Sequence, residues 1–195
     1  PMHAQCPPSA RWAAAAVALL AMGAYAVTLG NAFAWDDYYN VVHNVEIRDL
    51  ANVPRFFTEA WGASAADEMS RGINTNYWRP VALTSYAVDH ALFGLSPAPF
   101  HGVNLLLHTL ASLLVLLLGL RLFPNARDRW GVVVGAALFA VHPVHSEAVA
   151  VITYRTDLLA GLALIGGLAV WRGPAGRSAS RERWAVFGIV PALYT

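Results

Sequence analysis

The sequence predicts an all-α protein, a polytopic bundle of transmembrane helices. Three observations lead to this class. Of the 195 residues, 57% are hydrophobic and only 13% are charged, whereas a soluble domain carries about 25% charged residues. Apolar runs long enough to cross a bilayer recur along the chain. A longer and more polar segment, about residues 31–100, separates the first of these runs from the second.

The first apolar run, about residues 12–29, would reach roughly 27 Å as a helix, close to the thickness of a bilayer core. A cleaved signal peptide is an alternative interpretation, because Arg11 precedes the run and the small residues Ala32 and Ala34 follow it. The run is longer than the apolar core of a typical signal peptide. This length favours a retained first span.

The segment at about 31–100 is too polar to span, and we expect it to carry two helices at the membrane interface. The first would begin with Asn52 as its cap and Pro54 in its first turn. Its apolar residues recur at helical spacing: Val53, Phe56, Phe57 and Trp61. The second would open at Pro80 and close near Gly94, a length too short to cross, and it contains Asp89.

Further spans are predicted at about 103–122, 131–152 and 155–171, with an incomplete one from 184. The stretch "HPVHSE" interrupts the third of the four complete spans, and its proline, Pro143, predicts a kinked helix end. The last apolar run stops at the end of the sequence, so we expect residues 1–195 to be the N-terminal part of a larger membrane domain.

The distribution of charge orients the bundle. The segment between the first two spans holds eight acidic residues against four arginines. The short connections and the N-terminus hold the other arginines that flank spans: Arg11, Arg121, Arg127, Arg129, Arg172, Arg177, Arg181 and Arg183. The positive-inside rule then places the N-terminus in the cytoplasm and the acidic segment in the periplasm or lumen.

This topology gathers polar and ionisable side chains at the external face. They come from four spans and from the external segment: Asp36, Asp37, Arg79, His101, Asn104, His108, His142, His145, Glu147, Arg155 and Asp157. Ionisable groups at membrane depth are costly and by default indicate a functional site.

Each of these groups also has a structural interpretation. His101, Asn104 and His108 share one helical face, which favours interhelical hydrogen bonds over a metal site. The Asp36–Asp37 pair could be a solvated helix end. Arg155 and Asp157, like "HPVHSE", could serve only to hold the bundle together. The convergence of all these groups on one face favours a shared site.

Two carboxylates at a membrane surface have two chemical uses. One carboxylate acts as a general base for a hydroxyl while the other orients the substrate or raises its partner's pKa, or the two hold a divalent cation. Arginine and histidine nearby bind phosphate. A base beside a phosphate site at the edge of lipid fits sugar transfer from a lipid phosphate. No zincin, Walker A or GxSxG motif occurs, and the net charge of +1 gives no reason to expect a nucleic-acid partner.

Three stretches carry a resemblance to a known family: "FAWDDYYNVVHNVEI", "YWRPVALTSYAVDHALFGLSPAPFHGVNLLLH" and "LFAVHPVHSEAVAVITYRTDLLAGL". Together they resemble the membrane region of the transmembrane and tetratricopeptide-repeat O-mannosyltransferases and their bacterial relatives, over about residues 30–165. The resemblance implies a GT-C glycosyltransferase fold with a catalytic acidic pair in the first external loop. It also implies a polyprenyl- or dolichyl-phosphate sugar donor, usually carrying mannose, and a protein hydroxyl acceptor.

Carried over by motif, Asp36 and Asp37 match the catalytic acidic pair, and Arg79 begins the "RP" element. The remaining motif residues, with two histidines of the second span, are assigned to binding of the donor phosphate or substrate: His101, His108, His142, His145, Glu147, Arg155 and Asp157. We expect Asp36 to be the base and Asp37 to support it.

The predicted function is transfer of a sugar, mannose by resemblance, from a polyprenyl-phosphate carrier to a protein at the outer face of a membrane, with a bacterial inner membrane as the expected location. The expected partners are membrane lipid, the lipid-linked donor and the protein acceptor, and residues 1–195 alone are expected to be inactive. Two alternatives stay open: a transporter whose acidic and histidine residues line an ion pathway, and a non-catalytic assembly module. A divalent cation is an alternative role for the acidic pair.

Overall fold

The computed structural model describes residues 9–59 and 78–171. Within these ranges every regular element is helical. The α-helices are α1 (Ala10–Tyr25), α2 (Val53–Phe56), α3 (Pro80–Phe93), α4 (Pro97–Leu122), α5 (Arg129–Val141), α6 (Ser146–Ala150) and α7 (Arg155–Val170). Short 3-10 or π-helical turns connect them: η1 (Ala26–Gly30), η2 (Tyr38–Val42), η3 (Glu46–Arg48), η4 (Leu50–Asn52), η6 (Ala126–Asp128), η7 (Pro143–His145) and η8 (Ile152–Tyr154).

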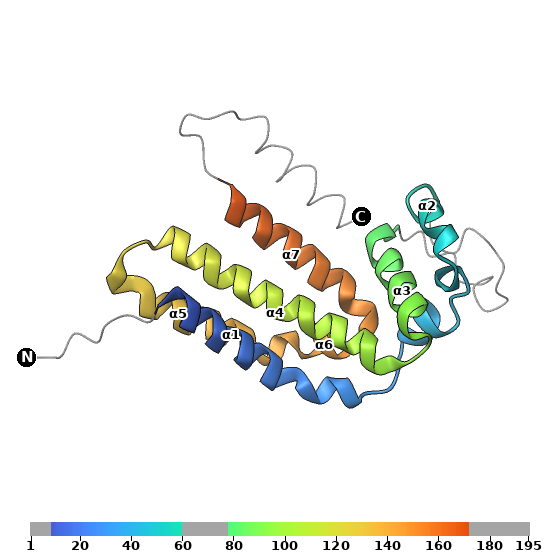
Figure 1. Ribbon diagram of the computed structural model, residues 1–195, viewed down its shortest axis with the longest axis horizontal. Helices are drawn as coiled ribbons and strands as arrows, with labels where there is room; N and C mark the ends of the chain where they lie inside the picture. Colours follow the sequence, from blue (N-terminus) through green and yellow to red (C-terminus); the bar gives the residue numbers. More distant parts are fainter. Residues whose placement is uncertain (1–8, 60–77, 172–195) are drawn as a thin grey trace, which may run out of the picture.

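The long helices form one elongated bundle in which α4 packs against α1, α5 and α7 (Figure 1). Three helical segments are long and apolar enough to cross a bilayer: Ala10–Gly30, Pro97–Leu122 and Arg129–Ala150. These helices indicate an integral membrane protein, and the predicted all-α polytopic class is confirmed. The second span begins at Pro97, six residues before the predicted position 103, because Pro97 is suited to a first helical turn.

The inner face of α1 consists mostly of small side chains. Ala13, Val17, Ala21 and Tyr25 are buried at intervals of four residues, which keeps them on one side of the helix. Their small size lets α1 approach α4 and α5 closely, as small residues do in membrane helix pairs. A shared apolar cluster with residues of α4 and α5 follows from this packing.

The third span bends at "HPVHSE", as the proline predicts. α5 ends at Val141, and His142 is extended with φ −68° and ψ 128°, the conformation that a following proline favours. Pro143 then opens the 3-10 turn η7, and α6 continues to Ala150. The motif thus divides the third span into α5 and α6.

The last described helix, α7, was predicted as a fourth span at 155–171. It has 16 residues, which corresponds to about 24 Å, and it packs along α4 (Figure 1). Its role as a full span stays a prediction. The incomplete span from 184 and the arginines at 172–183 lie outside the described residues.

The described residues between the first two spans form a helical cap at one end of the bundle (Figure 1). α3 has the predicted bounds, since Pro80 opens it and Gly94 follows its last residue with φ +63°, a conformation that glycine adopts without strain. The predicted short helix does begin after Asn52 with Pro54 in its first turn, but α2 ends at Phe56 after only four residues. Asn52 does not cap it with its side chain, which instead donates a hydrogen bond to the Glu46 carbonyl. Trp61 lies outside the described residues.

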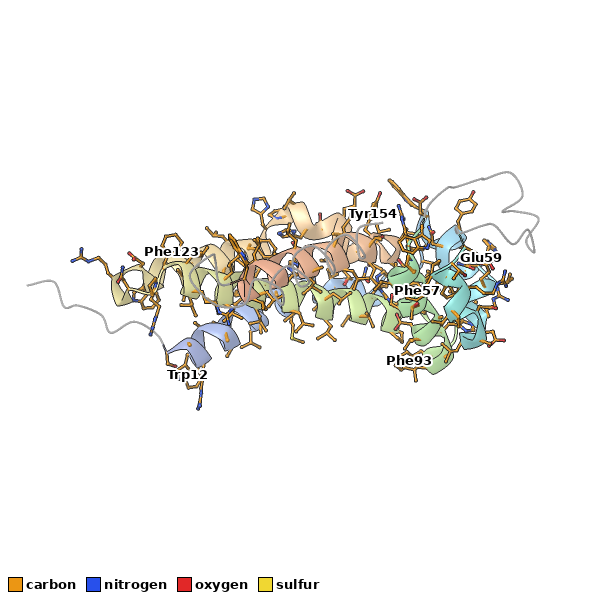
Figure 2. The ribbon with its side chains drawn as sticks, turned by 90° about the horizontal axis from the view of Figure 1, so that it is seen from above. Trp12, Phe57, Glu59, Phe93, Phe123 and Tyr154 are labelled. Carbon is orange, nitrogen blue, oxygen red and sulfur yellow. The ribbon has the colours of Figure 1, made fainter. Side chains whose placement is uncertain are left out.

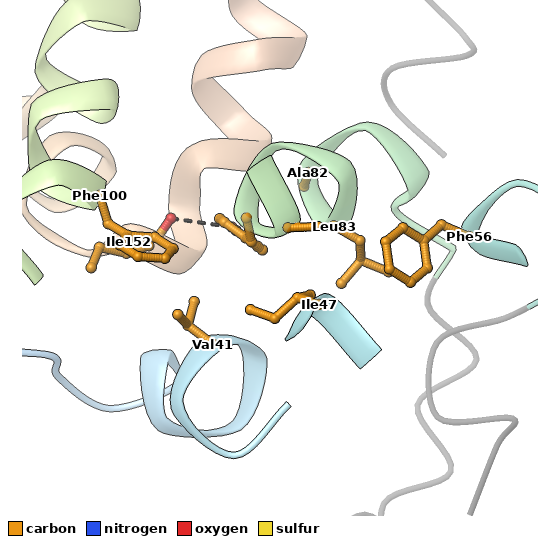
Figure 3. Close-up of a cluster of buried hydrophobic side chains, with 9 residues drawn as sticks. Val41, Ile47, Phe56, Ala82, Leu83, Phe100 and Ile152 are labelled. Carbon is orange, nitrogen blue, oxygen red and sulfur yellow. Dashed lines mark hydrogen bonds between the residues drawn. The ribbon is translucent and has the colours of Figure 1, made fainter. Parts of the chain in front are cut away.

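The apolar residues of this cap converge on one core. Figure 3 shows Val41, Ile47, Phe56, Leu83 and Ile152 packed together although they come from five separate elements. Phe56 at the end of α2 is therefore buried in this core, whereas the next residue, Phe57, is exposed. Seen from above, Phe57 and Phe93 mark the cap, while Trp12 and Phe123 lie at the opposite end of the bundle (Figure 2).

Candidate functional site

The adjacent aspartates occupy opposite environments. Asp37 is fully buried, and its carboxylate accepts hydrogen bonds from the Thr153 amide and hydroxyl, both at 2.9 Å, and from the Ala34 amide at 3.0 Å. The Asp36 residue is exposed. Neighbouring residues in a helical turn point about 100° apart, so the turn that buries one aspartate turns the other outward. Asp37 is thus an anchor, and Asp36 is open to a reactant.

The backbone just before the pair is strained. Trp35 has φ +51°, a value that a bulky residue rarely adopts, and its side chain is 80% exposed. Such strain persists only where the surrounding structure enforces it, and it gathers at functional sites. Here the Asp37–Ala34 hydrogen bond closes the turn that contains Trp35.

Three acidic residues, Asp36 among them, affect the pKa of Tyr154. The charge of Glu147, its hydrogen bond to the phenol, and the charges of Asp36 and Asp157 together raise the pKa of Tyr154 above its usual value. Negative neighbours disfavour the phenolate, which explains the direction. Glu147 and Asp157 are exposed like Asp36. Three predicted site residues from separate segments of the chain thus act electrostatically on one tyrosine.

Arg155 lies elsewhere, in the protein interior. Its side chain is fully buried, and its guanidinium donates to Asp89 at 2.6 Å, Asn104 at 2.8 Å, the Phe100 carbonyl at 2.9 Å and Ser85 at 3.1 Å. All three nitrogens of the guanidinium are therefore engaged. A donor phosphate reaches Arg155 only if this network opens.

The polar face of α4 confirms its structural interpretation. Asn104 donates to the Val151 carbonyl at 3.1 Å, and His108 Nε2 lies 2.9 Å from the Ala140 carbonyl. These contacts tie α4 to the third span. His101 is also fully buried, but neither of its ring nitrogens has a hydrogen-bond partner. All three side chains point into the bundle.

The remaining predicted residues lie nearer the surface. His142 is exposed, and its carbonyl accepts a 2.6 Å hydrogen bond from Tyr25 in α1. His145 is partly exposed, with its ring 5.1 Å from that of His108. Arg79 is partly exposed and immediately precedes α3. These three side chains are better placed than Arg155 to meet a phosphate at the surface.

The acidic pair does not present two open carboxylates to a cation, because Asp37 has both oxygens engaged. Within residues 9–59 and 78–171 no three histidine, cysteine, aspartate or glutamate side chains are arranged to hold a metal ion.

Four residues of the site region were not predicted as site residues: Asn40, Tyr86, Asp89 and Thr153. Thr153 donates to Asp37, and Asn40 donates to the Asp36 carbonyl. Asp89 pairs with Arg155, whose guanidinium also lies over the Tyr86 ring. One sequence signal was available, since Asp89 is a charged residue inside an apolar helix, and a buried charge needs a partner of opposite sign. The partner itself comes from a span 66 positions away.

The fold and site define a class: an all-helical, multi-span membrane protein that exposes a carboxylate at the end of its first span. Comparison with known proteins defines the family. The chain is 38% identical over 142 residues, 71% of its length, to Protein O-mannosyl-transferase Tmtc1 of Drosophila melanogaster. It is 37% identical over 155 residues to TMTC1 of Mus musculus and 36% identical over 157 residues to TMTC1 of Homo sapiens, in both cases 76% of its length.

Over the matched residues the chain belongs to the TMTC family of protein O-mannosyl-transferases. It spans about a sixth of these relatives, between 16% and 17% of their lengths. No protein-family model and no solved structure matches the chain.

Proposed function

We propose that the protein containing this chain transfers mannose from a polyprenyl-phosphate carrier to a protein hydroxyl at the external membrane face. The observation that carries the proposal is the division of the acidic pair into a buried anchor, Asp37, and an exposed carboxylate, Asp36. The names of the relatives, which are protein O-mannosyl-transferases, support the reaction class.

In the proposed reaction Asp36 takes the proton of the acceptor hydroxyl. The acceptor oxygen then forms a bond to C1 of the sugar from the face opposite the leaving group. The bond between C1 and the phosphate oxygen breaks, and its electron pair leaves with the polyprenyl phosphate. This is inverting transfer with one general base. For the phosphate we assign Arg79, His142 and His145, because their side chains reach the surface.

The external location is also part of the proposal. The arginines of the α4–α5 connection lie at the end of the bundle opposite the cap (Figures 1 and 2), and the positive-inside rule places that end in the cytoplasm. Impermeant thiol reagents should label cysteine at position 36 or 157 from outside, in a protein lacking Cys6. Labelling of position 127 from the same side would reverse the orientation.

The central experiment is sugar transfer by the full-length protein from a polyprenyl-phosphate-mannose donor to a hydroxyl-bearing peptide. Asp36→Asn keeps the shape of the side chain and removes the base, so transfer should fall at least about a hundredfold while donor binding is retained. Asp49→Asn is the matched control, since Asp49 is an exposed aspartate in the same external segment.

Full activity of the Asp36→Asn protein would refute the proposed base. A chelator arm separates the two uses of the pair. If chelation alone abolishes transfer and an added divalent cation restores it, the carboxylate is a metal ligand instead. If chelation has no effect and Asp36→Asn is inactive, the base assignment stands.

A further inference from the structure

We infer that Thr153, Arg155 and Asp89 are positioning residues that fix the place of the reactive Asp36 through its buried neighbour Asp37. This inference rests on the proposed function, since it assigns a role relative to the transfer reaction. It is carried by a chain of hydrogen bonds, most of them buried or partly buried, that joins α3, α4 and η8 to the loop after the first span.

The first link joins η8 to the acidic pair. Thr153 donates two hydrogen bonds to one oxygen of Asp37, from its amide and from its hydroxyl, at 2.9 Å each. Both residues are buried, Asp37 completely and Thr153 with 5% exposure. Hydrogen bonds are electrostatically stronger in the low dielectric of a protein interior than in water. The position of Asp37 is therefore set by the position of residue 153.

A second link reaches Asp36 directly. The side-chain amide of Asn40 donates to the Asp36 carbonyl at 2.8 Å and lies 3.5 Å from the Thr153 hydroxyl. The same hydroxyl that holds Asp37 thus contacts the residue that holds the Asp36 backbone. Movement of Thr153 would shift both members of the pair.

The third link holds η8 in place. The Tyr86 hydroxyl of α3 lies 3.2 Å from the carbonyl oxygens of both Ile152 and Thr153, and Asn104 of α4 donates to the Val151 carbonyl at 3.1 Å. Three successive backbone carbonyls are therefore bound by side chains of two different helices. Such binding restricts the segment more than packing alone, because each hydrogen bond depends on direction as well as on distance.

The last link is the buried ion pair. Arg155 Nη1 lies 2.6 Å from Asp89 Oδ2, and both side chains are buried, at 0% and 6% exposure. The guanidinium carbon Cζ also lies over the Tyr86 ring, 4.9 Å from its centre. Arg155 thereby fixes the relative positions of α3, α4 and the start of α7, the elements that carry the rest of the network.

Stability alone does not account for such a network. Desolvation of two charges offsets most of their attraction, and apolar residues of similar volume often stabilise a fold as well or better. An apolar core already closes this end of the bundle. What the polar network adds is a defined geometry, and misplacement of a catalytic group by about 1 Å lowers turnover on the order of a hundredfold.

The experiment compares kcat and KM in the full-length protein. Thr153→Val removes the hydroxyl and keeps the shape, and it should lower kcat on the order of tenfold with the donor KM unchanged, because the amide bond to Asp37 remains. Thr153→Ser restores the hydroxyl and should restore kcat. Thr109→Val is the matched control, since the Thr109 hydroxyl is buried but bonds only within α4.

A double variant tests the far end of the network. Asp89→Leu with Arg155→Met replaces the charges by apolar groups, and the protein should fold while kcat falls on the order of a hundredfold. A readout without turnover is the rate at which a thiol reagent labels Asp36→Cys in a protein lacking Cys6. Thr153→Val should raise this rate severalfold.

The outcomes separate the two proposals. Full activity of Asp36→Asn would overturn the proposed function. If Asp36→Asn is inactive while Thr153→Val and the folded double variant keep the wild-type kcat, the function stands and the positioning role is refuted. A fall in kcat that Thr153→Ser does not restore, or one that Thr109→Val matches, would also refute it, because either result indicates a loss of general stability.

Discussion

Removal of Arg155 should be one of the most damaging single changes in the described part of the protein. The Arg155→Met variant leaves Asp89 buried without its charge partner and leaves the Asn104 side-chain oxygen without a donor. Loss of one member of a buried ion pair costs about 3–5 kcal/mol. The orphaned amide oxygen adds about 1–3 kcal/mol. We therefore expect a loss of at least about 4 kcal/mol in the free energy of unfolding.

The Asp89→Leu variant and the double variant Asp89→Leu with Arg155→Met complete a double-mutant cycle. Asp89→Leu leaves the buried guanidinium of Arg155 without its charge partner. It should lower the free energy of unfolding by about 3–5 kcal/mol. The double variant leaves no buried charge without a partner. Only the cost of the Asn104 side-chain oxygen without a donor remains, about 1–3 kcal/mol. This expectation agrees with the electrostatics, since burial raises the pKa of the Asp89 carboxyl and the Arg155 charge offsets only part of that rise. The ion pair is therefore costly to break and adds little to stability in itself.

The measurement is equilibrium unfolding of the four proteins in detergent or bicelles. The double variant should be more stable than either single variant, with a coupling energy of at least about 2 kcal/mol between the two positions. Additive losses would show that the two side chains do not interact. Single variants as stable as the wild type would show that the pair is exposed to water.

Two other predictions concern different parts of the bundle. A Cβ added at Gly119 would lie 2.7 Å from Val132 Cγ1, so Gly119→Ala should cost about 1–3 kcal/mol. A second change, Val132→Ala, should recover most of that loss, whereas Gly161→Ala, where a Cβ meets nothing within 4 Å, should have little effect; equal losses at both glycines would contradict the close contact. Near the cap, Glu147→Gln should lower the raised pKa of Tyr154, because the charge of Glu147 is the largest cause of the rise. Absorbance titration of the phenol, with Tyr154→Phe to identify its signal, checks this, and an unchanged midpoint would contradict it.

Much of the fold could be predicted because lipid imposes simple rules. Apolar runs long enough to cross a bilayer predicted the first three spans, and Pro143 predicted the kink in the third. α3 could be bounded by Pro80 and Gly94, since each residue has a preferred place at a helix end. These features depend on local sequence, which is why they could be read without a structure.

The cap was harder to predict, because its apolar residues serve a core assembled from distant segments. The spacing around Phe56 was taken as the face of a helix on the membrane surface, whereas α2 has only four residues. Phe56 packs with residues of η2, η3, α3 and η8. The local spacing of apolar residues predicts which side chains are buried, but it does not predict the length of the helix.

The site was predicted as a set of residues, while their separate roles required the structure. The charges of Asp36, Glu147 and Asp157 all act on Tyr154, and a site shared by these residues stays a prediction. Arg155 was expected beside them, but its side chain turns inward to Asp89. Sequence position gives the height of a residue in the membrane, and it does not give the direction of its side chain around the helix axis.

The adjacency of the two aspartates has a physical consequence. A reactive carboxylate at the end of a span must be exposed, and an exposed side chain has few contacts to hold it in place. When the next residue is a buried carboxylate with three hydrogen bonds, one peptide unit separates a fixed point from a free one. The rigidity of that peptide limits the movement of Asp36 without covering its carboxylate. Two identical residues thus meet two opposed requirements, and the surrounding fold determines which of them each one meets.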